Sequence, residues 1–207
     1  MFHKGLLKVY LVTDHMALKG RDFYQAIEQA LQGGVTLVQL REKEISSREY
    51  YEKAVKIKNL TDQYSIPLII NDRVDIALAV GAAGVHVGQK DLPVSKVREI
   101  VGSQMIVGAT AKTVSLAVQA QKEGADYIGS GAIFQTSTKQ DAAALSMKEL
   151  KEITTSIHIP VVAIGGINIG NMEQLKGTGV AGIAVSSGIL GEMEPAKAAE
   201  KMKKAQF

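Results

Sequence analysis

Short runs of valine, isoleucine and leucine alternate with longer helix-like stretches from one end of this chain to the other. We count eight such runs, and each is followed by a helical or helix-length segment. Continuously apolar strands that alternate with helices are typical of a parallel sheet covered on both faces. Eight such units predict a closed (β/α)8 TIM barrel of the α/β class, and an open doubly wound sheet is the alternative.

The pattern also sets the expected limits of the elements. Helices are expected at 21–34 and at 46–64, the second with Ser46 or Ser47 as its cap and Glu49 in its first turn. No Ser/Pro-rich linker or low-complexity segment interrupts the chain, so residues 1–207 are predicted to form a single (β/α)8 domain. The expected strands cover residues 8–13, 36–41, 67–71, 84–88, 105–110, 126–131, 160–166 and 182–188.

The composition excludes several classes of protein. The chain has no cysteine, so disulfides and thiolate metal sites are excluded, and a cytoplasmic location is the default. A net charge of +3 and an aromatic content of 5% give no indication of nucleic-acid binding. The sequence shows neither a signal peptide nor a run that approaches the ~18 apolar residues of a membrane span. We therefore expect neither nucleic acid nor membrane as a partner.

Polar and charged side chains gather directly after the predicted strands. In a barrel, the loops that follow the strands form the active face. Asp72 and Asp91 would stand at the ends of the neighbouring third and fourth strands, so their carboxylates can converge. Two carboxylates without cysteine or a histidine pair suit Mg²⁺, which usually completes its shell with water and substrate phosphate oxygens. The alternative is that Asp72 caps the helix that follows it.

The side chains around these carboxylates can clamp an anion beside the metal. They include Gln39, Arg41, Lys43, Asn71 and Lys139, and together with the two carboxylates they predict a metal–diphosphate site. Arg41, Lys43 and Lys139 are the candidate catalytic groups, because their charges would stabilise a departing diphosphate. The simpler interpretation is that these loops are polar because they are solvated.

A second anion site is predicted after the seventh and eighth strands. Segments 163–168 and 184–189 place glycines and hydroxyls where barrels often hold a phosphate on backbone N–H groups. Tight turns that need positive φ are the alternative reason for the glycines. Residues 136–139 add hydroxyls near both sites, so two phosphorylated small molecules are expected. By contrast, His86 is expected to be a hydrogen-bonded histidine inside the barrel, and the basic stretch 197–204 a solvated helix face.

Along nearly its whole length the sequence resembles the thiamine-phosphate synthases. The resemblance implies a (β/α)8 barrel transferase that uses Mg²⁺ to join hydroxymethylpyrimidine diphosphate to thiazole phosphate, giving thiamine phosphate and pyrophosphate. Each motif alone is modest, but together the motifs are specific. They are YLVTD (10–14), VQLREK (38–43), INDRVDIAL (70–78), GVHVGQKD (84–91), GAT (108–110), ADYIGSGAIFQTSTK (125–139), AIGGI (163–167) and AVSSGI (184–189).

The resemblance also implies a role for individual positions. Mg²⁺ would be held by Asp72 and Asp91. The pyrimidine diphosphate would be bound by Gln39, Leu40, Arg41, Glu42, Lys43, Asn71, Thr110 and Lys139. The thiazole phosphate would be bound by Thr136, Ser137, Thr138, Gly166, Ser186 and Ser187.

Three positions depart from the family's pattern, and two other functions stay open. Thr110 stands where a serine is usual, and Lys112 where a histidine is frequent.

The related thiazole tautomerases resemble this chain too, but they carry a catalytic histidine after the glycines of strand six, where Ala132 stands here. A phosphate-ligand sensor on the same barrel is the non-enzymatic alternative, and a homo-oligomer is not excluded.

Overall fold

The barrel is closed. The computed structural model describes residues 2–135 and 145–205. Within them, eight parallel strands follow one another in chain order, and β8 pairs with β1 to complete the ring. This confirms the predicted fold class and excludes the open sheet. The strands are β1 (Val9–Val12), β2 (Leu37–Leu40), β3 (Leu68–Asn71), β4 (Gly84–Val87), β5 (Ile106–Thr110), β6 (Tyr127–Ser130), β7 (Val161–Ile164) and β8 (Gly182–Val185).

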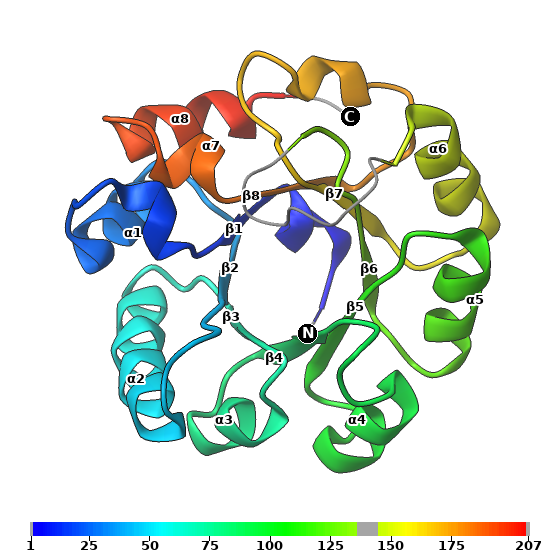
Figure 1. Ribbon diagram of the computed structural model, residues 1–207, viewed down its shortest axis with the longest axis horizontal. Coiled ribbons are helices and arrows are strands. Elements are labelled where there is room, and N and C mark those ends of the chain that lie inside the picture. Colours follow the sequence, from blue (N-terminus) through cyan, green and yellow to red (C-terminus); the bar gives the residue numbers. More distant parts are fainter. Residues whose placement is uncertain (1, 136–144, 206–207) are drawn as a thin grey trace.

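Helices surround the barrel on its outside (Figure 1). The predicted cap of the second long helix is confirmed, because the Ser46 side chain accepts from the Glu49 N–H and Glu49 returns a bond to the Ser46 N–H. The α-helices are α1 (Phe23–Gln32), α2 (Ser47–Gln63), α3 (Val74–Ala79), α4 (Val94–Val101), α5 (Val114–Lys122), α6 (Met147–Ser156), α7 (Ser187–Leu190) and α8 (Pro195–Lys203). The 3-10 helices are η1 (Lys4–Leu7), η2 (His15–Leu18) and η3 (Met172–Leu175).

The seventh unit departs from the predicted alternation. Among the described residues, only the short 3-10 turn η3 lies between β7 and β8, in place of a full α-helix. Gly165, Gly166 and Gly170 all fall in the segment after β7, and glycine is a poor helix former. The chain at this point is therefore mostly loop, and η3 packs Met172 and Leu175 into the layer outside the barrel.

Side chains alternate between the two faces of each strand. On β1, Val9 and Leu11 pack in the layer between the barrel and its helices, whereas Tyr10 and Val12 fill the barrel interior. The same alternation turns four polar residues inward near the carboxyl ends of their strands. These are Gln39, Asn71, His86 and Thr110.

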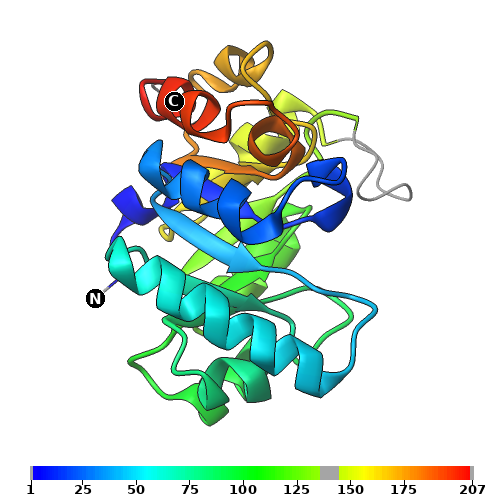
Figure 2. The same ribbon diagram turned by 90° about the vertical axis from the view of Figure 1, so that its left-hand side faces the viewer.

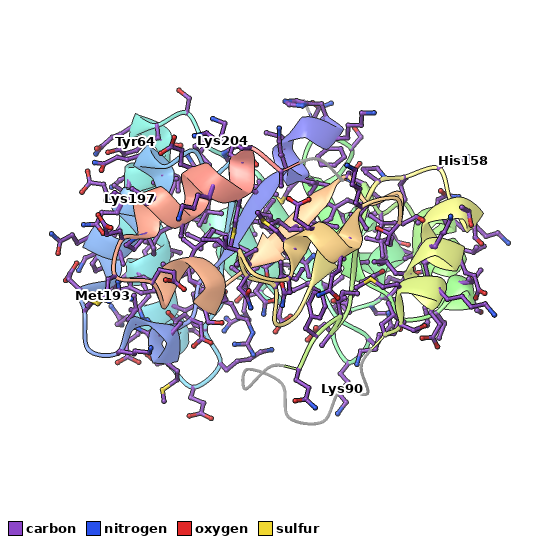
Figure 3. The ribbon with its side chains drawn as sticks, turned by 90° about the horizontal axis from the view of Figure 1, so that it is seen from above. Tyr64, Lys90, His158, Met193, Lys197 and Lys204 are labelled. Carbon is purple, nitrogen blue, oxygen red and sulfur yellow. The ribbon has the colours of Figure 1, made fainter. Side chains whose placement is uncertain are left out.

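The two ends of the barrel differ. In Figure 2 the N-terminus lies at the end of the barrel from which the strands start, so all strand carboxyl ends gather at the opposite end. On α8, Lys197 and Lys204 lie on the outer face (Figure 3), are exposed, and pair with Glu194 and Glu200. The basic C-terminal stretch is thus a solvated helix face, as predicted. None of the described helices has the length and hydropathy needed to cross a membrane.

Candidate active site

A cavity opens at the carboxyl ends of the strands, and all eight strands or the loops after them contribute to its wall. Its volume is about 150 Å³. The structure here brings together residues that are as much as 177 positions apart, from Tyr10 to Ser187. Seven predicted site residues line the cavity: Gln39, Arg41, Asn71, Thr110, Gly166, Ser186 and Ser187.

Two buried polar atoms of the cavity wall lack a hydrogen-bond partner among the described residues. They are Nδ2 of Asn71, at the end of β3, and Oγ of Ser186, at the end of β8. Buried polar groups are nearly always paired, so an unpaired one needs an explanation. A bound ligand with hydrogen-bond acceptors would satisfy both atoms, which supports the prediction that both residues bind a substrate.

The loop after β7 depends on its two glycines. Gly165 and Gly166 have φ values of +105° and +64°. A Cβ on Gly165 would lie 2.6 Å from Cα of Ala132, and one on Gly166 would lie 2.9 Å from Cβ of Phe134. Backbone conformation and close approach to the loop after β6 therefore both require glycine here. The tight turn also forms part of the cavity wall, so it is compatible with a phosphate site here, and that site stays a prediction.

Asp72, Asp91 and Lys43 form a cluster beside the cavity. Lys43 Nζ contacts Asp72 Oδ2, and Asp91 Oδ2 accepts from the backbone N–H of Gly88 at 2.7 Å. The alternative that Asp72 caps the next helix is wrong, because α3 begins after Arg73 and has no side-chain cap. Asp72 instead has a φ of +63° and donates its N–H to the carbonyl of His86 at 2.8 Å.

The electrostatics of this cluster suit a cation. Burial raises the pKa of Asp91, and the neighbouring Asp72 carboxylate raises it further, while the Gly88 N–H and Lys43 act in the opposite direction. The described residues contain no group of three His, Cys, Asp or Glu side chains that would hold a metal alone. A pair of hard oxygen donors fits Mg²⁺, which commonly takes its remaining ligands from water and substrate phosphate.

Arg41 is an uncompensated cation in the cavity wall. Its backbone N–H donates to Thr13 Oγ1 at 3.0 Å, which fixes the start of the loop after β2. Its guanidinium has no hydrogen bond or ion pair with any described residue. Lys43, by contrast, is already engaged by Asp72. Arg41 is thus placed to receive an anionic ligand, and Lys112 is a second cation in the cavity wall.

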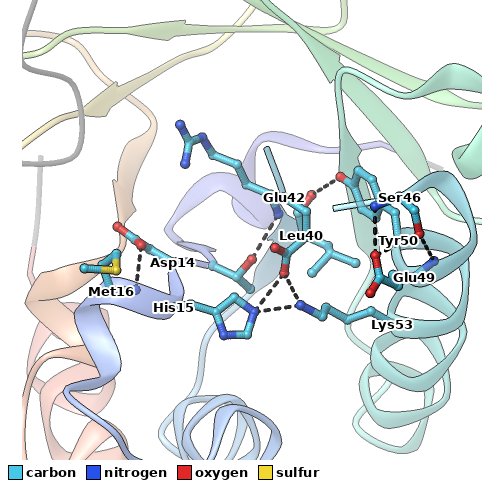
Figure 4. A network of polar contacts seen from close by, with 11 residues as sticks. Asp14, His15, Met16, Leu40, Glu42, Ser46, Glu49, Tyr50 and Lys53 are labelled. Atoms are coloured by element: carbon cyan, nitrogen blue, oxygen red, sulfur yellow. Dashed lines mark hydrogen bonds and ion pairs between the residues drawn. The ribbon is translucent and has the colours of Figure 1, made fainter. Parts of the chain in front are cut away.

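Two residues of the predicted 39–43 segment turn away from the cavity. Leu40 is fully buried in the core outside the barrel, because it alternates with the inward-facing Gln39. Glu42 contacts His15 Nε2 at 2.9 Å and Lys53 Nζ at 2.8 Å, and its side chain is only 7% exposed (Figure 4). The side chains of Leu40 and Glu42 are therefore absent from the wall that was expected to hold the pyrimidine diphosphate.

Sequence reasoning missed the role of α2 behind this segment. Tyr50 of α2 donates to the carbonyl of Leu40 at 2.8 Å (Figure 4) and to that of Asn71 at 3.1 Å, so it joins the ends of β2 and β3. Lys53, one turn further on, holds Glu42 together with His15. No motif marks this contact, because its residues come from three separate elements. The cluster anchors the loop that presents Arg41.

Glu42→Gln is expected to lower the free energy of unfolding by about 1–3 kcal/mol, since it leaves the partly buried Lys53 ammonium without its anionic partner. Denaturant unfolding of the ligand-free protein measures this change. The matched control is Glu99→Gln, because the exposed Lys96–Glu99 ion pair should contribute little. Equal stability of the two variants would show that the Glu42 cluster does not anchor the loop.

Four predicted residues lie outside the described part of the chain, so the structure does not place them. They are Thr136, Ser137, Thr138 and Lys139.

Catalytic groups of (β/α)8 enzymes stand at the carboxyl ends of the strands, where this cavity lies. The Arg41 guanidinium in the cavity wall, the acidic pair and the glycine loop are suited to phosphorylated ligands. Fold and site therefore define a barrel enzyme that acts on phosphorylated small molecules.

Comparison with known proteins identifies the enzyme family to which the chain belongs. Residues 9–189 match the family model described as thiamine monophosphate synthase, and the chain belongs to this family. It is 57% identical to a thiamine-phosphate synthase of Clostridium tetani over 98% of this chain and 97% of that protein. It is 59% identical to one of Enterococcus faecalis over 89% and 87%. A solved thiamine phosphate pyrophosphorylase from Pyrococcus furiosus shares the fold with a TM-score of 0.89 and 39% identity, covering 97% of this chain and 96% of that one.

Proposed function

We propose that this chain is a transferase that joins hydroxymethylpyrimidine diphosphate to thiazole phosphate, with thiamine phosphate and pyrophosphate as products. The observation that carries the proposal is the convergence of Gln39, Arg41, Asn71 and Thr110 on one cavity beside the Asp72–Asp91 pair. The names of relatives that align over nearly the whole chain support the same activity. The cysteine-free sequence supports a cytoplasmic location.

The proposed pyrimidine site combines shape with charge. Gln39, Asn71 and Thr110 would orient the aminopyrimidine and the first phosphate with neutral hydrogen bonds. Arg41, Lys43 and Lys139 would neutralise the negative charge that grows on the departing diphosphate. Mg²⁺, held by Asp72 and Asp91, would supply further charge stabilisation at the diphosphate oxygens.

The proposed thiazole site lies across the cavity. Backbone N–H groups near Gly166 and the Ser186 and Ser187 hydroxyls would hold the phosphate, together with Thr136 to Thr138. The phosphate would fix the thiazole so that its ring nitrogen faces the pyrimidine methylene, and this proximity would supply much of the remaining rate advantage.

The chemistry needs no covalent enzyme intermediate. As the C–O bond to the diphosphate breaks, the amino group delocalises positive charge over the pyrimidine ring. The thiazole nitrogen then attacks the methylene carbon, and the bonding pair of the broken bond leaves with pyrophosphate. The side chains of this site bind, orient and neutralise charge, and we assign none of them as a nucleophile.

A coupling assay on the purified protein tests the proposal. The protein is mixed with Mg²⁺ and both substrates, and the product is oxidised to fluorescent thiochrome, with one component omitted in each control. Product that requires Mg²⁺ and both substrates is the expected result. Absence of product from folded protein would contradict the proposal, and turnover of a thiazole tautomer would be measured next. Sedimentation of the same sample would distinguish a monomer from a homo-oligomer.

Gly166→Ala is expected to raise the KM for thiazole phosphate by about tenfold or more, because a methyl group at this positive-φ position would clash with the loop after β6 and displace the backbone that lines the proposed phosphate site. The KM for the pyrimidine diphosphate should change far less. Gly177→Ala is the matched control, since Gly177 also has positive φ but its Cβ would meet no atom. Equal effects on both KM values would indicate a general distortion and contradict the assignment of Gly166 to the thiazole phosphate.

A further inference from the structure

A chain of hydrogen bonds crosses the barrel interior beneath the cavity. Gln39 Nε2 donates to the Tyr10 hydroxyl at 2.6 Å, and the Tyr10 and Tyr127 hydroxyls are 2.7 Å apart. The Tyr127 hydroxyl lies 3.0 Å from His86 Nδ1, and His86 Nε2 lies 3.0 Å from Thr110 Oγ1. This chain of hydrogen bonds thus connects β2 to β5 through residues of β1, β6 and β4. Both of its end residues line the cavity, whereas Tyr127 does not.

The two tyrosines in the middle of this chain of hydrogen bonds lie in the core. Tyr10 is 1% exposed and Tyr127 is fully buried. A Cβ on Gly108 would lie 2.5 Å from His86 Nδ1 and closer still to the Tyr127 hydroxyl, so this position of β5 admits only glycine. Burial raises the pKa of both tyrosine hydroxyls well above the usual value, so each keeps its proton to donate.

These contacts fix the direction of every hydrogen bond. Tyr10 accepts from the Gln39 amide, so its own proton must go to Tyr127, its other partner. Among the described residues, Tyr127 then has His86 Nδ1 as its one acceptor, and a proton on that nitrogen would leave a buried hydroxyl unsatisfied. His86 therefore carries its proton on Nε2 and donates it to Thr110 Oγ1.

We propose that Tyr10 and Tyr127 are positioning residues that set the hydrogen-bond polarity of the pyrimidine site through His86. The bond to Tyr10 fixes the orientation of the Gln39 amide, and its oxygen is left to accept from a ligand. With the oxygen of Thr110 accepting from His86, its proton is left to donate. The site then offers an acceptor on β2 and a donor on β5.

This polarity matches the aminopyrimidine, and this step rests on the proposed function. An aminopyrimidine presents an amino group, which donates, and ring nitrogens, which accept. Gln39 would receive the amino group and Thr110 would donate to a ring nitrogen. An oxo analogue reverses donor and acceptor at these atoms, so it would leave the Gln39 amide oxygen and the Thr110 proton unpaired and bind more weakly.

Nuclear magnetic resonance of ¹⁵N-histidine-labelled protein tests the polarity without any substrate. The protein has four histidines, and variants that lack His3, His15 or His158 in turn assign the His86 signals. The expected spectrum shows His86 protonated at Nε2 and unprotonated at Nδ1. A proton on Nδ1 would overturn the proposal. This result does not depend on activity, so it is separate from the failure of the proposed function in the coupling assay.

Tyr127→Phe tests the positioning role, because it removes one hydroxyl and keeps the ring that stacks on Phe2. We expect His86 to lose its single tautomer, and kcat/KM for the pyrimidine diphosphate to fall about tenfold, with the KM for thiazole phosphate nearly unchanged. Tyr64→Phe is the control, because the Tyr64 hydroxyl bonds Glu28 on the outer surface (Figure 3). An unchanged tautomer, or an equal loss for both substrates, would overturn the proposal.

Discussion

Replacing Asp72 with asparagine is expected to lower the kcat of the coupling reaction by about 100-fold or more, because metal-ion stabilisation of developing charge is worth several kcal/mol. The Mg²⁺ concentration needed for half-maximal rate should rise at the same time. Asparagine keeps the size of the side chain and, like aspartate, tolerates the φ of +63° found here. The substitution therefore removes the charge with little change to the backbone. Thiochrome assays over a range of Mg²⁺ concentrations measure both effects.

Asp75→Asn is the matched control for this result. Asp75 lies three positions further along the chain, is largely exposed, and pairs with Arg73. Its variant should keep the kcat and the Mg²⁺ dependence of the original protein. Wild-type kinetics in Asp72→Asn would remove Asp72 from the metal site. A lower kcat with unchanged Mg²⁺ dependence would instead assign Asp72 to the orientation of Lys43, which it contacts.

The fold follows from the sequence because parallel barrel strands are buried on both faces and so stand out as short apolar runs. The run at 8–13 became β1 at Val9–Val12, and the run at 67–71 became β3 at Leu68–Asn71. The seventh unit was harder to predict. Its length suits a helix, but its glycines favour the loop that ends in η3.

The candidate site could be predicted from the sequence only in part. Position after a strand predicts which end of the barrel a residue occupies, and this placed Asn71 and Asp72 correctly. Position alone does not predict the direction of a side chain in the following loop. Glu42 turns to Lys53 while Arg41 lines the cavity, and that choice depends on α2.

The buried hydrogen-bond chain was only partly accessible from sequence. The alternation of β4 places His86 inside the barrel, and the structure confirms its hydrogen bonds there. Nothing in the sequence joins Tyr10 to Tyr127, because the two are 117 positions apart and belong to different strands. Only closure of the barrel brings their hydroxyls together.

Arg41→Met is expected to lower kcat by about 100-fold or more, since loss of one preorganised group that stabilises transition-state charge commonly costs 10²–10³. The guanidinium lines the cavity and has no partner among the described residues, so its whole charge is available to the diphosphate. Methionine keeps the length of the side chain and removes the charge. Arg41→Lys should retain part of the activity, because lysine keeps the charge and loses the bidentate geometry.

The kinetic constants for each substrate decide whether Arg41 acts on the diphosphate. In Arg41→Met, kcat should fall while the KM for thiazole phosphate changes little, because the two anions occupy different parts of the cavity. Arg48→Met is the control, since Arg48 is exposed on α2 and should tolerate the change. A rise confined to the KM for thiazole phosphate would move Arg41 to the other anion site. Unchanged kinetics would leave Lys43, Lys139 and Lys112, which also lines the cavity, as candidates for the charge that the departing diphosphate requires.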